Sequence, residues 1–252
     1  MALVSDLVSA IAEAEGIPQA TVNLVARYTR EAGFLSQGAR GRNAPRATVA
    51  DCANLLIAVN GSGCTVKKAP KAVEMFRRLR LHAPHGSRTT TGIGVAYTKI
   101  DPDELRFLDR HGAATFGEVL ESIVDRFIGG ELAMFMKGEA SKYLGDEFFE
   151  KAVKEIGDNP RALAERVATA CEMFLRLGTV GFTLEFHRPN PFVRLVIDRQ
   201  IGPDRELIAG ASFIVDVGDL EARRIKSFEG DRHERTVIGY RTLMKVAEVM
   251  RR

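Results

Sequence analysis

The pattern of apolar positions divides the chain into an N-terminal helical part, a helical middle and a late region of strands. In residues 3–14 the apolar side chains recur every three or four positions, as they do on one face of an amphipathic helix. Gly16 ends this helix, and Pro18 begins a second helix that extends to about Ala32. The short Gly-Ile-Pro connection between them predicts a helix-turn-helix.

The second helix is predicted to have one apolar and one polar face. On a helical wheel, the side facing the protein is formed by Thr21, Leu24, Val25, Tyr28 and Ala32. The opposite side has no carboxylate among its residues, which are Gln19, Asn23, Arg27 and Arg30. Amides and guanidiniums are the groups that read adenine and guanine edges in the DNA major groove, and they also bind phosphates. The second helix is therefore the candidate recognition helix.

A segment rich in glycine and arginine follows the second helix. Residues 36–46 contain two glycines, one proline and no acidic residue, and their arginines are Arg40, Arg42 and Arg46. We interpret this segment as a β-hairpin wing that contacts the DNA backbone or a narrow A·T-rich minor groove. A solvated loop that touches phosphate or nothing is the alternative. Thr48 and Asp51 then form a capping box that opens a third helix.

This order of elements resembles a winged helix-turn-helix and is most similar to that of the mercury-resistance-type (MerR) regulators. The matching residues are Ala12, Gly16-Ile17, Thr21-Val22, Arg27-Tyr28, residues 31–35 and, after the wing, Thr48, Asp51, Leu55 and Ala58. The resemblance covers about the first quarter of the chain. It implies that the second helix enters the major groove, that the wing contacts the backbone or minor groove, and that a dimer binds a near-palindromic site. The family's long coiled coil and C-terminal metal-binding cysteines have no counterpart in this sequence.

The charge distribution agrees with a polyanion-binding N-terminal part. Residues 1–100 contain thirteen Lys or Arg and six Asp or Glu, whereas residues 101–252 contain 23 and 27. A basic head joined to a mildly acidic body favours nucleic-acid binding by the head, although an ordinary solvated basic face gives the same counts. A further helix is expected after residue 70. Its outward residues are Arg77, Arg78 and Arg80, which either extend a DNA contact or are simply solvated.

The remaining pattern predicts helices followed by a small sheet. Residues 82–94 are the expected linker, and capping residues begin helices near Thr115 and Pro160. Beyond Gly178 the apolar period changes from 3.6 to 2, which predicts antiparallel strands. The expected strands are 180–186, 192–197 and 207–217, and the closing helix is 236–252.

These elements predict an α+β fold with three parts. Residues 1–66 form the winged helix-turn-helix domain, residues 67–100 a basic helix and linker, and residues 101–252 an α+β domain that dimerises or binds a protein partner. The chain has no apolar run approaching the ~20 residues that cross a bilayer, so no membrane contact is expected. Its three cysteines lack the C-x-x-C spacing, and no secretory signal is present, which favours a reduced cytoplasmic protein.

We therefore expect a sequence-specific double-stranded DNA-binding protein. It would be a bacterial or phage-type transcriptional regulator, associated with the nucleoid and acting as a homodimer. No catalytic or metal-binding motif is complete, so we expect no enzyme, no metal and no cofactor. One alternative is a phage DNA-packaging recognition subunit, similar to a small terminase, that uses the same head in a ring. Another is a protein-interaction module whose basic face binds an acidic protein.

Overall fold

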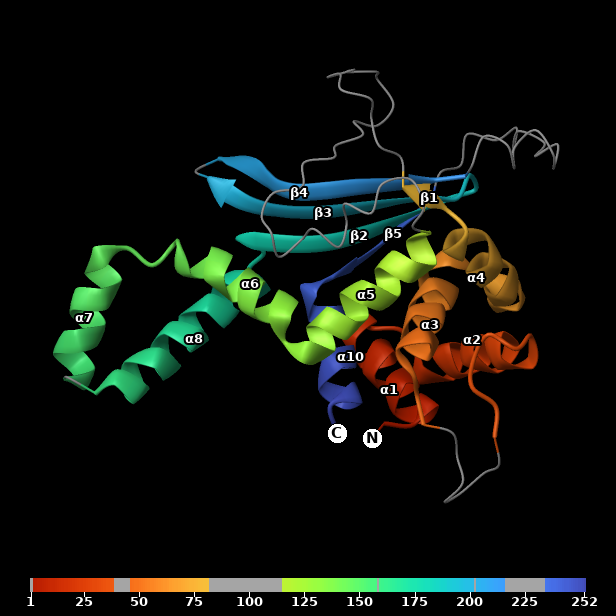
Figure 1. Ribbon diagram of the computed structural model, residues 1–252, viewed down its shortest axis with the longest axis horizontal. Coiled ribbons are helices and arrows are strands. Elements are labelled where there is room, and N and C mark those ends of the chain that lie inside the picture. The colour runs from red at the N-terminus through yellow and green to blue at the C-terminus, as the bar shows by residue number, and fades with distance from the viewer. Residues whose placement is uncertain (1, 39–45, 82–114, 158, 202, 216–233) are drawn as a thin grey trace.

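The computed structural model has an α+β fold in which helices gather below one five-stranded antiparallel sheet (Figure 1). It describes residues 2–38, 46–81, 115–157, 159–201, 203–215 and 234–252. The helices are α1 (Val4–Glu15), α2 (Gln19–Glu31), α3 (Val49–Gly61), the short 3-10 helix η2 (Val66–Lys68), α4 (Ala69–Arg77), α5 (Phe116–Gly129), α6 (Glu131–Ser141), α7 (Asp146–Ile156), α8 (Pro160–Arg176) and α10 (Tyr240–Met250). The expected linker, residues 82–94, lies outside the described residues.

The sheet has the strand order β1-β4-β3-β2-β5, and every neighbouring pair is antiparallel. Its strands are β1 (Arg80–Leu81), β2 (Val180–Arg188), β3 (Phe192–Ile201), β4 (Asp204–Ile214) and β5 (Glu234–Gly239). The alternation predicted for the first long strand is confirmed, because every second residue from Val180 to Phe186 is buried. A strand with this period buries one face of the sheet against the helices.

Phenylalanine side chains join the sheet to the helices. Phe116 of α5 lies between Phe186 of β2 and Phe213 of β4, with ring centroids 5.7 and 5.2 Å apart. Phe76 of α4 reaches the same Phe186 ring at 5.6 Å. These separations are typical of edge-to-face and tilted aromatic pairs. The aromatic content of the chain therefore fills the core between α4, α5 and the sheet.

The N-terminal helices share this core. α1 packs against α10, and α3 packs against α5, so that buried apolar residues run without a break from Leu7 in α1 to Val246 in α10. The ion pair between Lys245 and Glu13, with 3.0 Å between nitrogen and oxygen, joins the surfaces of the same two helices. The segment formed by α1 and α2 is thus supported directly by α10.

The last predicted helix is wrong in its first residues. Residues 236–239 belong to β5, which pairs with β2 from Arg188↔Glu234 to Thr183↔Gly239. Gly239 has an extended backbone (φ −127°, ψ −173°), and the helix begins only at Tyr240. Val237, expected on the buried stripe of a helix, is 45% exposed in the strand. The third predicted strand begins at Asp204 and ends at Ile214, three residues earlier at each end than expected.

Helices α7 and α8 form an arm that extends away from the sheet (Figure 1). In α7 the buried residue is Ala152, and in α8 the buried residues are Cys171 and Leu175, near the end that meets the sheet. Several apolar side chains of the arm are in solvent, including Phe149, Val153, Met173 and Leu177. No helix among the described ranges is both long and apolar enough to cross a membrane.

Candidate nucleic-acid interface

A tight corner joins α1 to α2. Gly16 has a left-handed backbone (φ +67°), and its N–H and that of Ile17 both donate to the carbonyl oxygen of Ala12. Pro18 then starts the next helix, with the Thr21 N–H donating to its carbonyl oxygen at 2.8 Å. A β-carbon disfavours the left-handed conformation, whereas glycine adopts it readily. The corner predicted from the Gly-Ile-Pro sequence is confirmed.

The buried face of α2 differs from the predicted one. Val22, Val25, Ala26 and Thr29 are buried, whereas Leu24 is 45% exposed. Ala32 is exposed, and Thr21 and Tyr28 are half-buried. α2 lies against α1, α3 and α4 together, and the small side chains of Ala26 and Thr29 allow close approach on the side that faces them. Thr29 satisfies its buried hydroxyl by donating to the Val25 carbonyl oxygen at 2.7 Å.

The four candidate residues of α2 are all exposed. Two of them make side-chain contacts: the Nε2 of Gln19 donates to the Ser9 Oγ at 2.8 Å, and Nε of Arg27 lies 2.7 Å from Oε1 of Glu31. Asn23 and Arg30 lie on the same exposed surface. Glu31 is one helical turn after Arg27, so the polar face is not free of carboxylate as the sequence suggested. The Arg27–Glu31 pair is a solvent-exposed contact, the kind that a phosphate can displace at little cost.

Both ends of the expected wing segment are anchored to the start of α3. The buried carboxylate of Asp51 accepts from the N–H and Oγ of Ser36 at 2.7 and 2.8 Å. It also accepts from the N–H and Oγ1 of Thr48, both at 2.8 Å, which confirms the capping box. The Nδ2 of Asn54 adds a hydrogen bond to the Phe34 carbonyl oxygen at 2.6 Å. Four hydrogen bonds to one carboxylate fix where the segment leaves and rejoins the fold.

The wing itself is only partly within the described residues. Arg40, Arg42 and the hairpin expected around them lie outside the described residues. Arg46 is exposed and forms an antiparallel bridge with Leu3, beside a hydrogen bond from the Ala47 N–H to the Ala2 carbonyl oxygen at 2.9 Å. Arg46 is therefore placed at the N-terminus of the chain, next to the start of α1.

The basic residues beyond α2 fall into two groups. Arg77, expected to point outward, is half-buried: its Nη1 donates to the Asn54 Oδ1 at 2.6 Å, and its Nη2 pairs with Glu121. Arg77 therefore joins α4 to α3 and α5 rather than facing solvent. Arg78 is exposed and pairs with Glu74 at 3.4 Å. The exposed lysines on η2 and α4, two elements that pack against α2, are Lys67, Lys68 and Lys71.

A titratable group lies at the end of α1, directly before the corner. Glu15 accepts a hydrogen bond from the Nδ2 of Asn60 at 3.2 Å, and the same nitrogen lies 3.1 Å from the Leu56 carbonyl oxygen. Burial raises the pKa of Glu15 to about 7, although the hydrogen bond from Asn60 opposes the shift. The Oδ1 of Asn60 is buried without a hydrogen-bond partner among the described residues.

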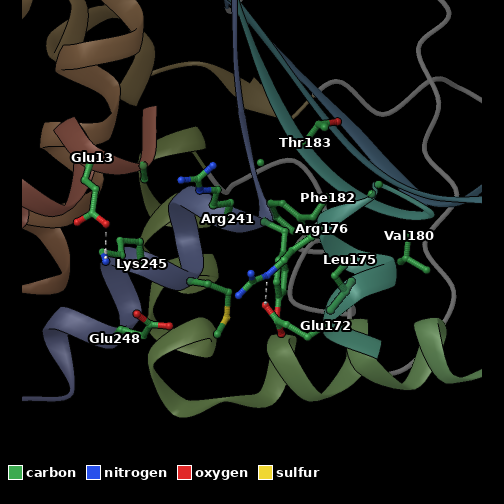
Figure 2. A pocket seen from close by; sticks show the side chains of 16 residues that line it. Glu13, Glu172, Leu175, Arg176, Val180, Phe182, Thr183, Arg241, Lys245 and Glu248 are labelled. Atoms are coloured by element: carbon green, nitrogen blue, oxygen red, sulfur yellow. Dashed lines mark hydrogen bonds and ion pairs between the residues drawn. The ribbon is translucent and has the colours of Figure 1, made fainter. Parts of the chain in front are cut away.

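A cavity of about 630 Å³ lies where α1, α8, β2 and α10 meet (Figure 2). Figure 2 shows two ion pairs among the residues that line it: Lys245 to Glu13 at 3.0 Å, which joins α10 to α1, and Arg176 to Glu172 at 3.7 Å, one turn apart within α8. The charged residues that line it are three acids and three bases, so the cavity carries no net charge. The hydroxyl of Tyr240 is buried and has no hydrogen-bond partner in the part of the chain that the structure describes, and burial raises the pKa of this hydroxyl well above the ordinary value. This balance favours neither anion nor cation binding.

The described residues do not bring together three His, Cys, Asp or Glu side chains that could hold a metal ion. The Ser36–Asp51 contact was not predicted. The basic character of residues 67–71 can be read from the sequence, since Lys67 and Lys68 stand adjacent to each other without an acidic neighbour, but their position beside α2 cannot. Comparison of the chain with protein-family models, curated proteins and solved structures gave no match.

Proposed function

We propose that the chain binds double-stranded DNA and that α2 is the helix that reads base edges. The observation that carries the proposal is the common exposure of Gln19, Asn23, Arg27 and Arg30 on a helix whose other side is buried. A helix held in this way presents amide and guanidinium groups to a groove without further rearrangement. Amides pair with adenine and guanidiniums with guanine in the major groove.

The surroundings of α2 support the same proposal. Its first turn contains no acidic residue, so the positive end of the helix dipole is not compensated there. The lysines of η2 and α4 add exposed positive charge beside it, and Arg46 adds another charge at the base of the wing segment. Contacts of this kind hold a protein on the phosphate backbone without reading sequence. We assign backbone contacts to the lysines and to Arg40, Arg42 and Arg46.

On this proposal the protein is a transcriptional regulator that acts as a homodimer. One helix of thirteen residues contacts only a few base pairs, and two copies on a near-palindromic site supply the remaining affinity. The mass in solution tests this part of the proposal. A dimer agrees with regulation, whereas a ring of eight or more copies would point to DNA packaging instead.

The direct test is selection of binding sites from randomised duplex DNA at about 150 mM salt, a concentration at which nonspecific contacts are weakened. We expect an enriched two-fold motif for the wild type. The Arg27→Ala variant should lose about tenfold in affinity for that motif and relax the preference at one base pair, whereas Lys67→Gln should weaken all sequences alike and lower the salt slope by about 1.

Two variants serve as controls. Glu31→Gln removes a carboxylate from the same surface, so it should bind DNA at least as well as the wild type. The pair Lys151→Gln and Lys154→Gln on the exposed surface of α7 makes a larger charge change far along the chain, and it should leave the motif unchanged. Absence of any enriched motif, with all variants retained equally, would refute base reading by α2.

A further inference from the structure

A second cavity, of about 570 Å³, lies between the connection from α3 to α4 and the ends of β2 and β5. We call it the α4 cavity. The charged residues lining it are Lys68, Lys71, Arg188 and Glu234. Three cations face one carboxylate, in contrast to the balanced cavity beside α10. None of these residues is among those assigned to base reading.

Arg188 is the most buried of the three cations. Its Nη2 lies 3.2 Å from Oε2 of Glu234 and 3.3 Å from the Thr236 Oγ1. Its Nε and Nη1 are buried, and neither has a hydrogen-bond partner among the described residues. Buried donors without partners are rare in proteins and costly when they carry charge, so the guanidinium places an incompletely compensated positive charge beside the cavity.

Gly63 allows the guanidinium to sit where it does. A β-carbon on Gly63 would lie 2.1 Å from the Nη1 of Arg188, and the glycine has a left-handed backbone (φ +67°). Any side chain at this position would therefore displace the arginine. The loop after α3 is shaped around the guanidinium, which holds Arg188 in place against the cavity.

The two lysines stand at the beginning of α4, where positive potential is highest. Lys68 precedes the helix and Lys71 lies in its first turn, and both side chains are exposed. The start of α4 has no side-chain cap and no acidic residue, so the positive end of its dipole adds to the lysine charges. The rest of the cavity wall combines apolar side chains, among them Met75, Phe76 and Pro191, with the small polar ones of Ser62 and Thr65.

We propose that the α4 cavity binds a small phosphate ester. The phosphate is held between Lys68, Lys71 and the incompletely paired guanidinium of Arg188, and the organic part lies against the apolar wall. The volume exceeds what a bare phosphate fills, so an organic group can occupy the remainder. A backbone phosphate of bound DNA has the same charged group, and the experiment separates this source from a free ester.

The experiment is calorimetric titration of the full chain with phenyl phosphate, inorganic phosphate and phenol in chloride buffer at constant ionic strength. We expect phenyl phosphate to bind more tightly than inorganic phosphate, because its ring covers apolar wall, and phenol not to bind measurably. The double variant Lys68→Gln, Lys71→Gln should weaken phenyl phosphate binding about tenfold. The control is again Lys151→Gln, Lys154→Gln, with binding within about twofold of the wild type.

All of the exchanged lysines are exposed, and circular dichroism confirms that each variant is folded before it is titrated. The proposal is overturned if neither phosphate binds the wild type, or if the Lys68, Lys71 variant binds like the control. Equal affinity for the two phosphates would remove the organic part from the assignment. A second titration repeats the phenyl phosphate arm on the chain already bound to duplex DNA, and loss of phenyl phosphate binding there identifies the DNA backbone as the natural source. Since the first titration contains no DNA, its outcome is independent of whether α2 reads bases.

Discussion

Helices α3 and α7 have similar lengths, 13 and 11 residues, but opposite surroundings. In α3 the buried residues include polar ones, Asp51, Asn54 and Asn60, and each of them makes hydrogen bonds to neighbouring elements. In α7 a single residue, Ala152, is buried, and Phe149 and Val153 remain in solvent. Apolar periodicity therefore predicts which side of a helix packs against other elements, but it does not predict what fraction of the helix those elements bury.

The contrast predicts its largest effect for core truncation. Leu56→Ala in α3 removes a fully buried side chain and should lower the free energy of unfolding by about 2–5 kcal/mol. Val153→Ala in α7, where the side chain is 41% exposed, should change it by less than about 0.5 kcal/mol. Urea unfolding followed by circular dichroism measures both. Similar losses in the two variants would mean that the arm is packed against something in solution.

The next-largest loss of stability is expected from removing the aspartate in the first turn of α3, compared with the same exchange in α7. Asp51→Ala leaves the donors of Ser36 and Thr48 without their acceptor and should cost about 2–3 kcal/mol. It should also speed proteolysis between residues 36 and 48, since the ends of that segment lose their anchor. The matched exchange Asp146→Ala removes an exposed acid from the first turn of α7 and should cost no more than about 1 kcal/mol. Equal protease sensitivity in the two variants would contradict the anchoring role.

Glu15 extends the comparison to pH. Its pKa of about 7 in the folded chain lies above the ordinary value of 4.5, so the folded state binds more protons than the unfolded state between these values. The stability from Glu15 is fully present below pH 4.5 and is lost as the pH rises through 7. At pH 8, Glu15→Gln should be more stable than the wild type by up to about 3 kcal/mol, reduced by the partial exposure of the group.

The control for this prediction is Glu150→Gln on the exposed surface of α7, which should leave the pH profile of stability unchanged. The stability of the wild type and of the two variants is measured by thermal unfolding at a series of pH values from 4 to 8. This pH range includes both the ordinary and the raised pKa of Glu15. If the stability of the wild type instead rises with pH over this range, burial of the ionised Glu15 carboxylate does not destabilise the folded state.

The smallest expected effect distinguishes two tyrosines. Tyr240→Phe removes a buried hydroxyl for which the described residues supply no partner, and we expect stability to stay the same or rise by up to about 1 kcal/mol. Tyr143→Phe removes a hydroxyl that donates to the Gln200 carbonyl oxygen, so it should cost up to about 1 kcal/mol. Denaturant melts of the two variants should therefore shift in opposite directions. A clear loss in Tyr240→Phe would reveal a partner for its hydroxyl.

Sequence reasoning succeeded where local chemistry determines structure. The left-handed Gly16, the Thr48 capping box and the alternation along β2 all depend on residues a few positions apart. It failed where a distant partner decides. β5 is a strand because it pairs with the edge of β2. The residues that pair are far apart in the sequence, as the contact between Arg235 and Glu185, 50 positions apart, shows.

The candidate site divides in the same way. Exposure of the polar residues on α2 was predictable from the helical period, and it is confirmed for all four residues. The exact rotation of α2 was not, because it depends on which of Leu24 and Ala26 lies nearer its packing partners. Two contacts could be found only in the three-dimensional structure. Arg77 pairs with Glu121, 44 positions later in the chain, and Arg188 packs against Gly63.

The packing of α1 on α10 has a consequence for synthesis on the ribosome. Glu13 and its partner Lys245 are 232 residues apart, which at about 5–20 residues per second corresponds to a delay on the order of ten seconds or more. During that delay the side of α1 that α10 covers has no native partner in the nascent chain. The segment formed by α1 and α2 thus cannot reach its final packing before α10 has been synthesised.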